Sequence, residues 1–341
     1  MSKLLKQKTK SMIIPPFTSA SEIKYGEKET VILTKTGQKL FSKCIGCKNH
    51  ECCIFTEKEL STSSFSIPTD IRSNVCPSEA INFDRNGGVI IDKNRCIGCG
   101  LCILRCPLGA IHLVNGVADV ANADTIMNNP SKAEELKKEQ LCIDIKKVKK
   151  TGSLLSVNEK HIQNFYDKFE KLPSQIQIAD ILVRNLFIQL GAKYGIRRRG
   201  DVINRIDGIM LKKDSVVLNE VELSEDVLES PRAVLDDIAI YKYKFASKDS
   251  SASGLITLSH LPNTRAELWR VIEDIYYVLG IKIDVVTIGT LLVLAWNGAK
   301  LDNVKSYFYD QKSKCRAVLK ELSISSSAIS NGFLSVFETN K

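Results

Sequence analysis

The sequence predicts two domains of different class, a small cysteine-rich α+β domain followed by a larger α/β domain with a mixed sheet. The chain has 341 residues, 44% of them hydrophobic, which is enough for two ordinary cores. Nine of its 11 cysteines lie between Cys44 and Cys106. Downstream of them, strand-like runs alternate with helical runs. We expect an N-terminal extension, the cysteine-rich domain, a linker and the α/β domain over residues 1–40, 41–120, 121–160 and 161–341.

Composition narrows the class of protein. The longest apolar run, Val285 to Trp296, is too short to cross a bilayer, which needs about 20 residues. No signal peptide is visible near the N-terminus, so we expect a cytoplasmic protein with no membrane partner. The net charge of +9 permits nucleic-acid binding without showing it. In the cytoplasm, 11 cysteines indicate metal or redox chemistry rather than disulfides.

The most specific motif is a cysteine run with the spacing C-x2-C-x2-C-x3-C-P. In bacterial ferredoxins the fourth cysteine of this run binds the cluster of the other repeat, so a second half-motif is required. A candidate second half lies upstream. The run consists of Cys96, Cys99, Cys102, Cys106 and Pro107, and the second half of Cys44, Cys47, Cys52, Cys53 and Cys76.

The stretch CPSEAINFDRNGGVIIDKNRCIGCGLCILRCPLGAIHL resembles the repeat of two-cluster bacterial ferredoxins. It has the CP-x-x-AI turn, a hairpin through Gly87 and Gly88, and the ligand loop, and the resemblance covers roughly residues 41–118. It implies an α+β ferredoxin-like fold with two [4Fe–4S] clusters. A zinc site, the alternative, would need cysteines in paired C-x2-C groups and does not explain two C-P closures.

The crossing rule assigns the ligands of each cluster. One cluster is expected on Cys76, Cys96, Cys99 and Cys102, and the other on Cys44, Cys47, Cys106 and either Cys52 or Cys53. The first repeat departs from the family spacing, because its third ligand follows after four or five residues and an insertion separates it from Cys76. The choice between Cys52 and Cys53 therefore stays open, as does loss or replacement of this cluster.

The rest of the chain predicts an α/β domain. A helix is expected from Ser174 to Leu190, and Gly191 ends it. The order then is a hairpin with a third strand, helix, strand, helix and strand, which indicates a mixed sheet. The strand-like runs cover 201–211, 215–223, 254–261 and 281–296, and the helical runs 229–245 and 263–280. A short helix is also expected within residues 128–140 of the linker.

Carboxylates gather on one predicted hairpin. If the turn at residues 212–215 is symmetric, Asp207 lies opposite Glu220, with their Cβ atoms about 4.5–5.5 Å apart. Glu222 shares that face and Val221 points the other way. Oxygen ligands at this density suit Mg²⁺ or Mn²⁺. The alternative is a solvated face on which Arg205 pairs with Glu222.

The segment GAKYGIRRRGDVINRIDGIMLKKDSVVLNEVELSE resembles the PD-(D/E)xK restriction-endonuclease-like superfamily, and the resemblance covers about residues 175–300. Asp207 matches the motif aspartate and Glu220 the next acidic residue, while Glu222 stands where lysine is usual. The resemblance implies a metal held by both acids and the Val221 carbonyl, which activates water. Glu222 would then act as general base or metal ligand, or Lys242 or Lys244 on the next helix would supply the displaced lysine. Complete loss of that lysine would leave an inactive, binding-only fold.

Three functions fit these patterns. The first is a DNA nuclease that uses Mg²⁺ or Mn²⁺, preferably an endonuclease in defence or repair, with DNA contacted by Arg197, Arg198 and Arg199. These arginines fit a solvated loop equally well. The second is an electron-transfer protein whose C-terminal domain docks a redox partner. The third is a redox-gated DNA-binding protein without cleavage.

Overall fold

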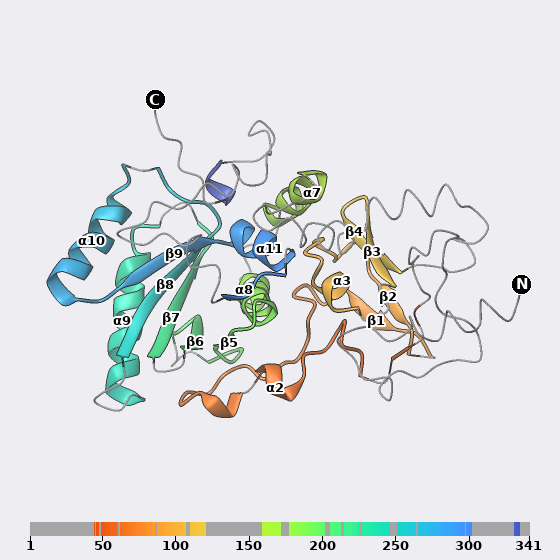
Figure 1. Cartoon of the computed structure of the whole chain (residues 1–341), viewed down its shortest axis with the longest axis horizontal. Helices are drawn as coiled ribbons and strands as arrows, with labels where there is room; N and C mark the ends of the chain where they lie inside the picture. The colour runs from red at the N-terminus through yellow and green to blue at the C-terminus, as the bar shows by residue number, and fades with distance from the viewer. Residues whose placement is uncertain are drawn as a thin grey trace, which may run out of the picture.

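In the computed structural model, helices lie between the cysteine-rich region, on the right of Figure 1, and the β-sheet, left of its centre. The structure describes residues 44, 46–47, 49–60, 62–85, 87–106, 110–120, 159–171, 177–201, 205–212, 215–224, 227–245, 251–263, 265–296, 298–301 and 331–334. The helix expected within residues 128–140 and nearly all of the expected linker lie outside these residues.

The cysteine-rich region is built on two short antiparallel hairpins. Each hairpin follows a C-P pair, so the repeat visible in the sequence is also a repeat of structure. A short helix, α3 (Leu101–Arg105), precedes the second hairpin and carries one of the clustered cysteines. The strands are β1 (Ile81–Phe83) with β2 (Val89–Ile91), and β3 (Ile111–Val114) with β4 (Val117–Val120).

The C-terminal region holds a five-stranded mixed sheet in the order β5-β6-β7-β8-β9. The first three strands are antiparallel, whereas β7, β8 and β9 run parallel. This confirms the mixed sheet, although sequence analysis missed strand β5. The strands are β5 (Lys193–Ile196), β6 (Gly208–Lys212), β7 (Ser215–Glu222), β8 (Ser251–Leu258) and β9 (Ile283–Thr287).

Helices cover both faces of this sheet. Alternate residues of each strand point to opposite faces, so Val216 and Val217 belong to different hydrophobic cores. The Val216 face packs against α9 (Ser230–Lys244) and α10 (Glu267–Leu279), and the Val217 face packs against α8 (Gln177–Gln189) and α11 (Ile288–Trp296). The core on the Val217 face is completed by helix α7 (Glu159–Phe169) and the 3-10 turn η4 (Asn331–Leu334). Sequence analysis did not predict α7.

The strand-like run expected from Ile281 to Trp296 is wrong in its second half. Strand β9 ends at Thr287, and α11 occupies the remaining residues. The run is apolar throughout, so its periodicity does not distinguish a buried strand from a buried helix. Thr287 marks the change, because its Oγ1 accepts a hydrogen bond of 3.2 Å from the backbone N–H of Thr290.

Among the described residues, no helix is long and apolar enough to cross a membrane.

The insertion that separates Cys53 from Cys76 packs against the C-terminal sheet. It contains α2 (Glu57–Leu60) and the 3-10 turn η1 (Thr62–Ser64), and α2 contacts the edge strand β5 (Figure 1). Phe65 and Ile67 join the core on the Val216 face of the sheet. The cysteine-rich region and the C-terminal helices also share a core, in which Leu101 packs with Leu186 and Trp296. The cysteine-rich region and the C-terminal region therefore pack directly against each other.

Candidate metal centres

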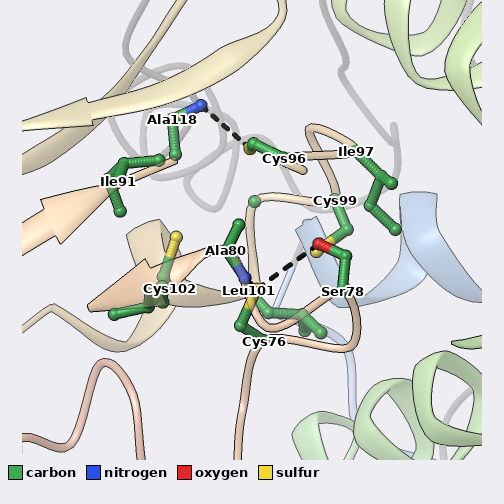
Figure 2. A pocket seen from close by; sticks show the side chains of 12 residues that line it. Cys76, Ser78, Ala80, Ile91, Cys96, Ile97, Cys99, Leu101, Cys102 and Ala118 are labelled. Carbon is green, nitrogen blue, oxygen red and sulfur yellow. Dashed lines mark hydrogen bonds between the residues drawn. The ribbon is translucent and has the colours of Figure 1, made fainter. Parts of the chain in front are cut away.

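Four cysteines converge on one cavity, which we call the Cys96 site. Cys96 and Cys99 belong to the loop before α3, Cys102 lies in α3, and Cys76 lies in the turn before β1. Figure 2 shows these cysteines arranged around a common space. The lining also includes apolar side chains of Ile81, Ile91, Ile97 and Leu101.

Two glycines shape the ligand loop of the Cys96 site. Gly98 and Gly100 have φ angles of 74° and 71°, in the left-handed region that favours glycine. A Cβ on Gly98 would also collide with the carbonyl oxygen of Gly116 at the tip of the second hairpin. The ligand loop therefore lies directly against the hairpin of β3 and β4.

A second set of cysteines, which we call the Cys44 site, gathers around Ala110. Cys44, Cys47 and Cys106 all pack against this buried alanine. Burial, followed by the charges of Cys106, Cys52 and Cys44, raises the pKa of the Cys47 thiol to about 12. Cys52 is therefore close enough to Cys47 and Cys44 to interact with both thiols.

The two sites carry matching hydrogen bonds to sulfur. The N–H of Ala80 donates to Cys76 Sγ and that of Ala110 to Cys106 Sγ, each over 3.2 Å. Backbone N–H groups also donate to Cys96 Sγ and Cys44 Sγ over 3.3 and 3.4 Å; the donors are Ala118 and Val89. Such bonds stabilise thiolate ligands and tune the potential of an iron–sulfur cluster.

The donor set of the Cys96 site fits an iron–sulfur cluster. Burial raises the pKa of the Cys99 and Cys102 thiols, and the neighbouring cysteines raise it further. Four thiolates packed together in an apolar cavity are unfavourable unless a cationic centre binds them. Iron would supply that charge, and the backbone N–H groups would donate hydrogen bonds to the cysteine sulfur atoms that remain partly negative.

Helices of the C-terminal region hold the backbone of the Cys96 site. Trp296 Nε1 on α11 donates a buried hydrogen bond of 2.9 Å to the Cys99 carbonyl. Asn185 Nδ2 on α8 donates to the carbonyls of Asn74 and Val75, just before Cys76, over 3.1 and 2.9 Å. Lys168 on α7 bonds to carbonyls of the same site, reaching those of Gly116 and Cys96 over 2.7 and 3.4 Å.

The carboxylates lie at the end of the β6–β7 hairpin. The ladder pairs Gly208 with Asn219 and Lys212 with Ser215, so its register continues to Asp207 opposite Glu220. Asp207 Oδ2 accepts a hydrogen bond of 3.2 Å from the Val221 N–H. The register agrees with the symmetric turn inferred from sequence, although Asp207 itself lies just outside β6.

Burial and mutual repulsion make this carboxylate cluster unusual. Burial raises the pKa of Glu220 to about 8, and the charges of Asp207, Asp237 and Glu222 contribute. The pKa of Asp207 is also raised by burial, and Arg197 opposes this effect. Arg197 Nη2 lies 3.4 Å from Asp207 Oδ1. A cation near these groups would relieve their repulsion.

Two members of the cluster were missed in the sequence. Asp180 on α8 and Asp237 on α9 have pKa values raised to about 7, mainly by burial and then by the charge of Asp207. Asp237 is 3% exposed, and its Oδ2 has no hydrogen-bond partner within the described part of the chain. Its position on the apolar face of α9, between Val234 and Tyr241, was the available signal.

Other predicted site residues lie elsewhere. Lys242 and Lys244 are exposed in the last turn of α9, so the structure does not bring them to the buried carboxylates. Arg198 and Arg199 are exposed in the turn after β5, whereas Arg197 is half-buried beside Asp207. Val221 and Glu222 are the last two residues of β7 and directly follow Glu220.

Comparison with known proteins identifies the cysteine-rich region. A family described as the LdpA Fe-S cluster-binding domain matches residues 72–117, which include all four cysteines of the Cys96 site. An uncharacterized ferredoxin of Methanocaldococcus jannaschii is 50% identical over 44 residues, covering 13% of this chain and 28% of that protein. The electron transport protein HydN of Escherichia coli is 34% identical over 99 residues, covering 21% of this chain and 56% of HydN.

The thiosulfate reductase electron transfer subunit PhsB of Salmonella typhi is 48% identical over 56 residues, covering 15% of this chain and 29% of PhsB. The chain thus spans between 28% and 56% of the length of these three relatives. The matches show that it contains a ferredoxin-like, iron–sulfur cluster-binding domain. Of these three relatives, PhsB and HydN are named as electron-transfer proteins.

Proposed function

We propose that this chain is an electron-transfer protein with two [4Fe–4S] clusters, one in the Cys96 site and one in the Cys44 site. The observation that carries the proposal is the duplicated ligand geometry, in which equivalent N–H groups donate to Cys76 and Cys106. When bound, each cluster accepts and releases single electrons. The electron-transfer roles named for HydN and PhsB support the same reading.

The residues around the two clusters would shield them from solvent to different degrees. Trp296, Asn185 and Lys168 cover the backbone of the Cys96 site, where Cys99 and Cys102 are buried and Cys76 and Cys96 half-buried. In the Cys44 site, Cys44, Cys47 and Cys106 are all half-buried. We propose that a redox partner exchanges electrons through the more exposed Cys44 site. The apolar lining of the Cys96 site would exclude water from the other cluster.

Electron return to an acceptor tests this function. The anaerobically purified full chain would be reduced with dithionite, freed of excess reductant and mixed with oxidised methyl viologen. We expect the protein to return about two electrons per chain, and the Cys106→Ser variant about one. Protein that contains iron and sulfide but is not reversibly reduced would contradict the proposal and leave the clusters a structural role.

The carboxylate cluster favours a second candidate function, metal-dependent hydrolysis of DNA by a PD-(D/E)xK-like domain. Asp207, Glu220 and the buried Asp237, whose Oδ2 has no hydrogen-bond partner among the described residues, form an acidic group at the end of β7. The order of helix α8, antiparallel strands β5 to β7, helix α9 and parallel strand β8 supports this proposal. Mg²⁺ or Mn²⁺ there would activate water for attack on phosphate.

Cleavage assays separate this candidate from simple electron transfer. Plasmid and linear DNA would be incubated with Mg²⁺ or Mn²⁺ and either wild type, Asp207→Asn or Glu220→Gln. We expect cleavage by wild type only, and Lys242→Ala, an exposed position, should cleave normally. DNA binding without cleavage under reduced and oxidised conditions would favour the redox-gated DNA-binding alternative, with Arg198 and Arg199 as backbone contacts.

A further inference from the structure

The two ligand loops of the cysteine-rich region differ in length. Both begin with the sequence C-I-G-C. In the Cys96 site the third cysteine follows after two residues, whereas in the Cys44 site Cys52 follows Cys47 after four. A longer loop has more conformations to lose, so additional contacts are needed to hold its third thiol in place.

The extra residues of the longer loop form a turn at His50. The His50 carbonyl accepts hydrogen bonds of 2.7 and 3.0 Å from the N–H groups of Cys53 and Ile54. Its Nε2 donates a hydrogen bond of 3.1 Å to the carbonyl of Gly87, in the turn of the β1–β2 hairpin. The same hairpin carries the N–H that donates to Cys44 Sγ. His50 therefore fixes the middle of the loop.

Arg105 fixes the end of the loop. This residue is the last of α3 and directly precedes Cys106. Its Nε donates a hydrogen bond of 2.8 Å to the carbonyl of Glu51, which directly precedes Cys52. One side chain thus joins the backbone beside Cys52 to the backbone beside Cys106, although the two cysteines come from different repeats.

The insertion after Cys53 holds the Arg105 side chain in this position. Arg105 Nη1 and Nη2 donate hydrogen bonds of 2.6 and 3.0 Å to the two carboxylate oxygens of Glu59, a bidentate pair. Glu59 also accepts bonds of 2.8 and 3.0 Å from the N–H and hydroxyl of Thr56. The guanidinium lies 4.5 Å from the ring centre of Phe55.

The ion pair between Arg105 and Glu59 is charged and shielded from water. Burial alone would raise the pKa of Glu59, but the hydrogen bonds from Arg105 and Thr56 hold it below its ordinary value. The Arg105 side chain is only 11% exposed. Removing either partner would therefore leave the other as an unbalanced charge in a partly buried position.

The Cys96 site provides a comparison, because an arginine also directly precedes one of its cysteines. Arg95 Nη2 lies 3.6 Å from Glu79 Oε2, and both side chains are more than half exposed. An exposed pair of this kind contributes little to stability. The extensive contacts of Arg105 are therefore not a general feature of an arginine beside a ligand cysteine.

We infer that Arg105 is a positioning residue for the Cys44 site, which it completes by holding the backbone beside Cys52 against the end of α3. Glu59, supplied by the insertion, orients the arginine and balances its charge. The insertion thereby compensates for the longer ligand loop. This inference rests on the proposed cluster in the Cys44 site.

Iron and sulfide analysis, with an EPR-monitored potentiometric titration of the anaerobically purified full chain, tests the role of Arg105. We expect Arg105→Gln to fall from about eight iron atoms per chain to about four and to lose one of about two one-electron reductions. The reduction that depends on Cys76 should remain, which would show that the variant is folded. The matched control Arg95→Gln should keep both clusters.

Glu59→Gln provides a readout that a merely structural role would not change. The variant keeps the bond from Arg105 to the Glu51 carbonyl but removes the negative charge that balances the guanidinium. Reduction of the cluster in the Cys44 site should then become about 2- to 10-fold more favourable, because the reduced cluster is the more negative form. The cluster in the Cys96 site should shift less.

Two results would overturn the inference alone. The first is wild-type iron content and both reductions in Arg105→Gln, and the second is a Glu59→Gln variant with unchanged potentials. Wild type with about four iron atoms would instead refute the proposed cluster in the Cys44 site, and the inference would fail with it. The failure of the inference and that of the proposed function are thus distinguished by the wild-type protein.

Discussion

The indole Nε1 of Trp296 donates a hydrogen bond of 2.9 Å to the carbonyl oxygen of Cys99. Trp296 is the last residue of α11 in the C-terminal region, and Cys99 lies in the ligand loop of the Cys96 site. Both are buried, so the bond is formed away from water. The iron–sulfur site and the α/β region are therefore joined by a specific contact as well as by their common core.

This contact predicts a measurable effect of Trp296→Phe. The variant leaves the Cys99 carbonyl without its donor, which should lower the free energy of unfolding by roughly 1–3 kcal/mol in urea titrations. The EPR spectrum of the cluster in the Cys96 site should also change. Trp269→Phe is the control, because Trp269 makes an equivalent bond of 2.9 Å to Asn263 in the α10 region. An identical change of spectrum in both variants would argue against a specific role for Trp296.

A charge beside the Cys96 site predicts a change of reduction potential. Lys168 Nζ bonds to the carbonyls of Gly116 and Cys96, and its positive charge favours the more negative, reduced cluster. We expect Lys168→Met to lower the potential of this cluster by on the order of 20–60 mV, or ~0.5–1.4 kcal/mol. Lys171→Met removes an exposed charge from the same region and should change the potential less. Equal shifts would show that only overall charge matters.

The open choice of ligand in the Cys44 site predicts different outcomes for adjacent cysteines. Cys52 acts on Cys47 in the Cys44 site, and its Sγ lies 3.3 Å from that of Cys53. We therefore expect Cys52→Ser to lose about half of the bound iron, whereas Cys53→Ser keeps nearly all of it. Iron and sulfide analysis of both variants provides the test. The opposite result would assign Cys53 as the ligand.

The carboxylates predict a pH dependence of stability. Burial raises the pKa of Glu220 from its ordinary value of 4.5 to about 8. The folded protein then holds a proton that the unfolded chain releases, so the free energy of unfolding falls as pH rises through this window. Without divalent cations, Glu220→Gln should gain on the order of 1–3 kcal/mol relative to wild type between pH 5 and pH 8. A constant difference between the two proteins would contradict the buried, protonated state.

Sequence reasoning reached the cysteine sites because spacing encodes their geometry. The C-x2-C-x2-C run and the C-P pairs predict which thiols converge, and the structure places Cys76 beside Cys96 as expected. The β6–β7 register was also accessible, because a symmetric turn at residues 212–215 determines which residues face Asp207. In both cases, a pattern within the sequence itself was enough to predict which residues come together.

Features that depend on tertiary packing were missed. Nothing local distinguishes α11 from a strand in an apolar run, and only the fold shows that Asp180 and Asp237 face the same carboxylates. The contact of Trp296 with Cys99 joins residues 197 positions apart, which no sequence period records. The exposed position of Lys242 likewise follows from which face of α9 packs on the sheet.

The central claim is that the chain carries two redox-active clusters, and an EPR-monitored potentiometric titration of the anaerobically purified full chain tests it most directly. We predict about eight iron atoms per chain and two one-electron reductions, one of which is lost in Cys76→Ser and the other in Cys106→Ser. About four iron atoms with a single transition that depends on Cys76 alone would contradict a cluster in the Cys44 site. The absence of any reducible signal would contradict electron transfer altogether.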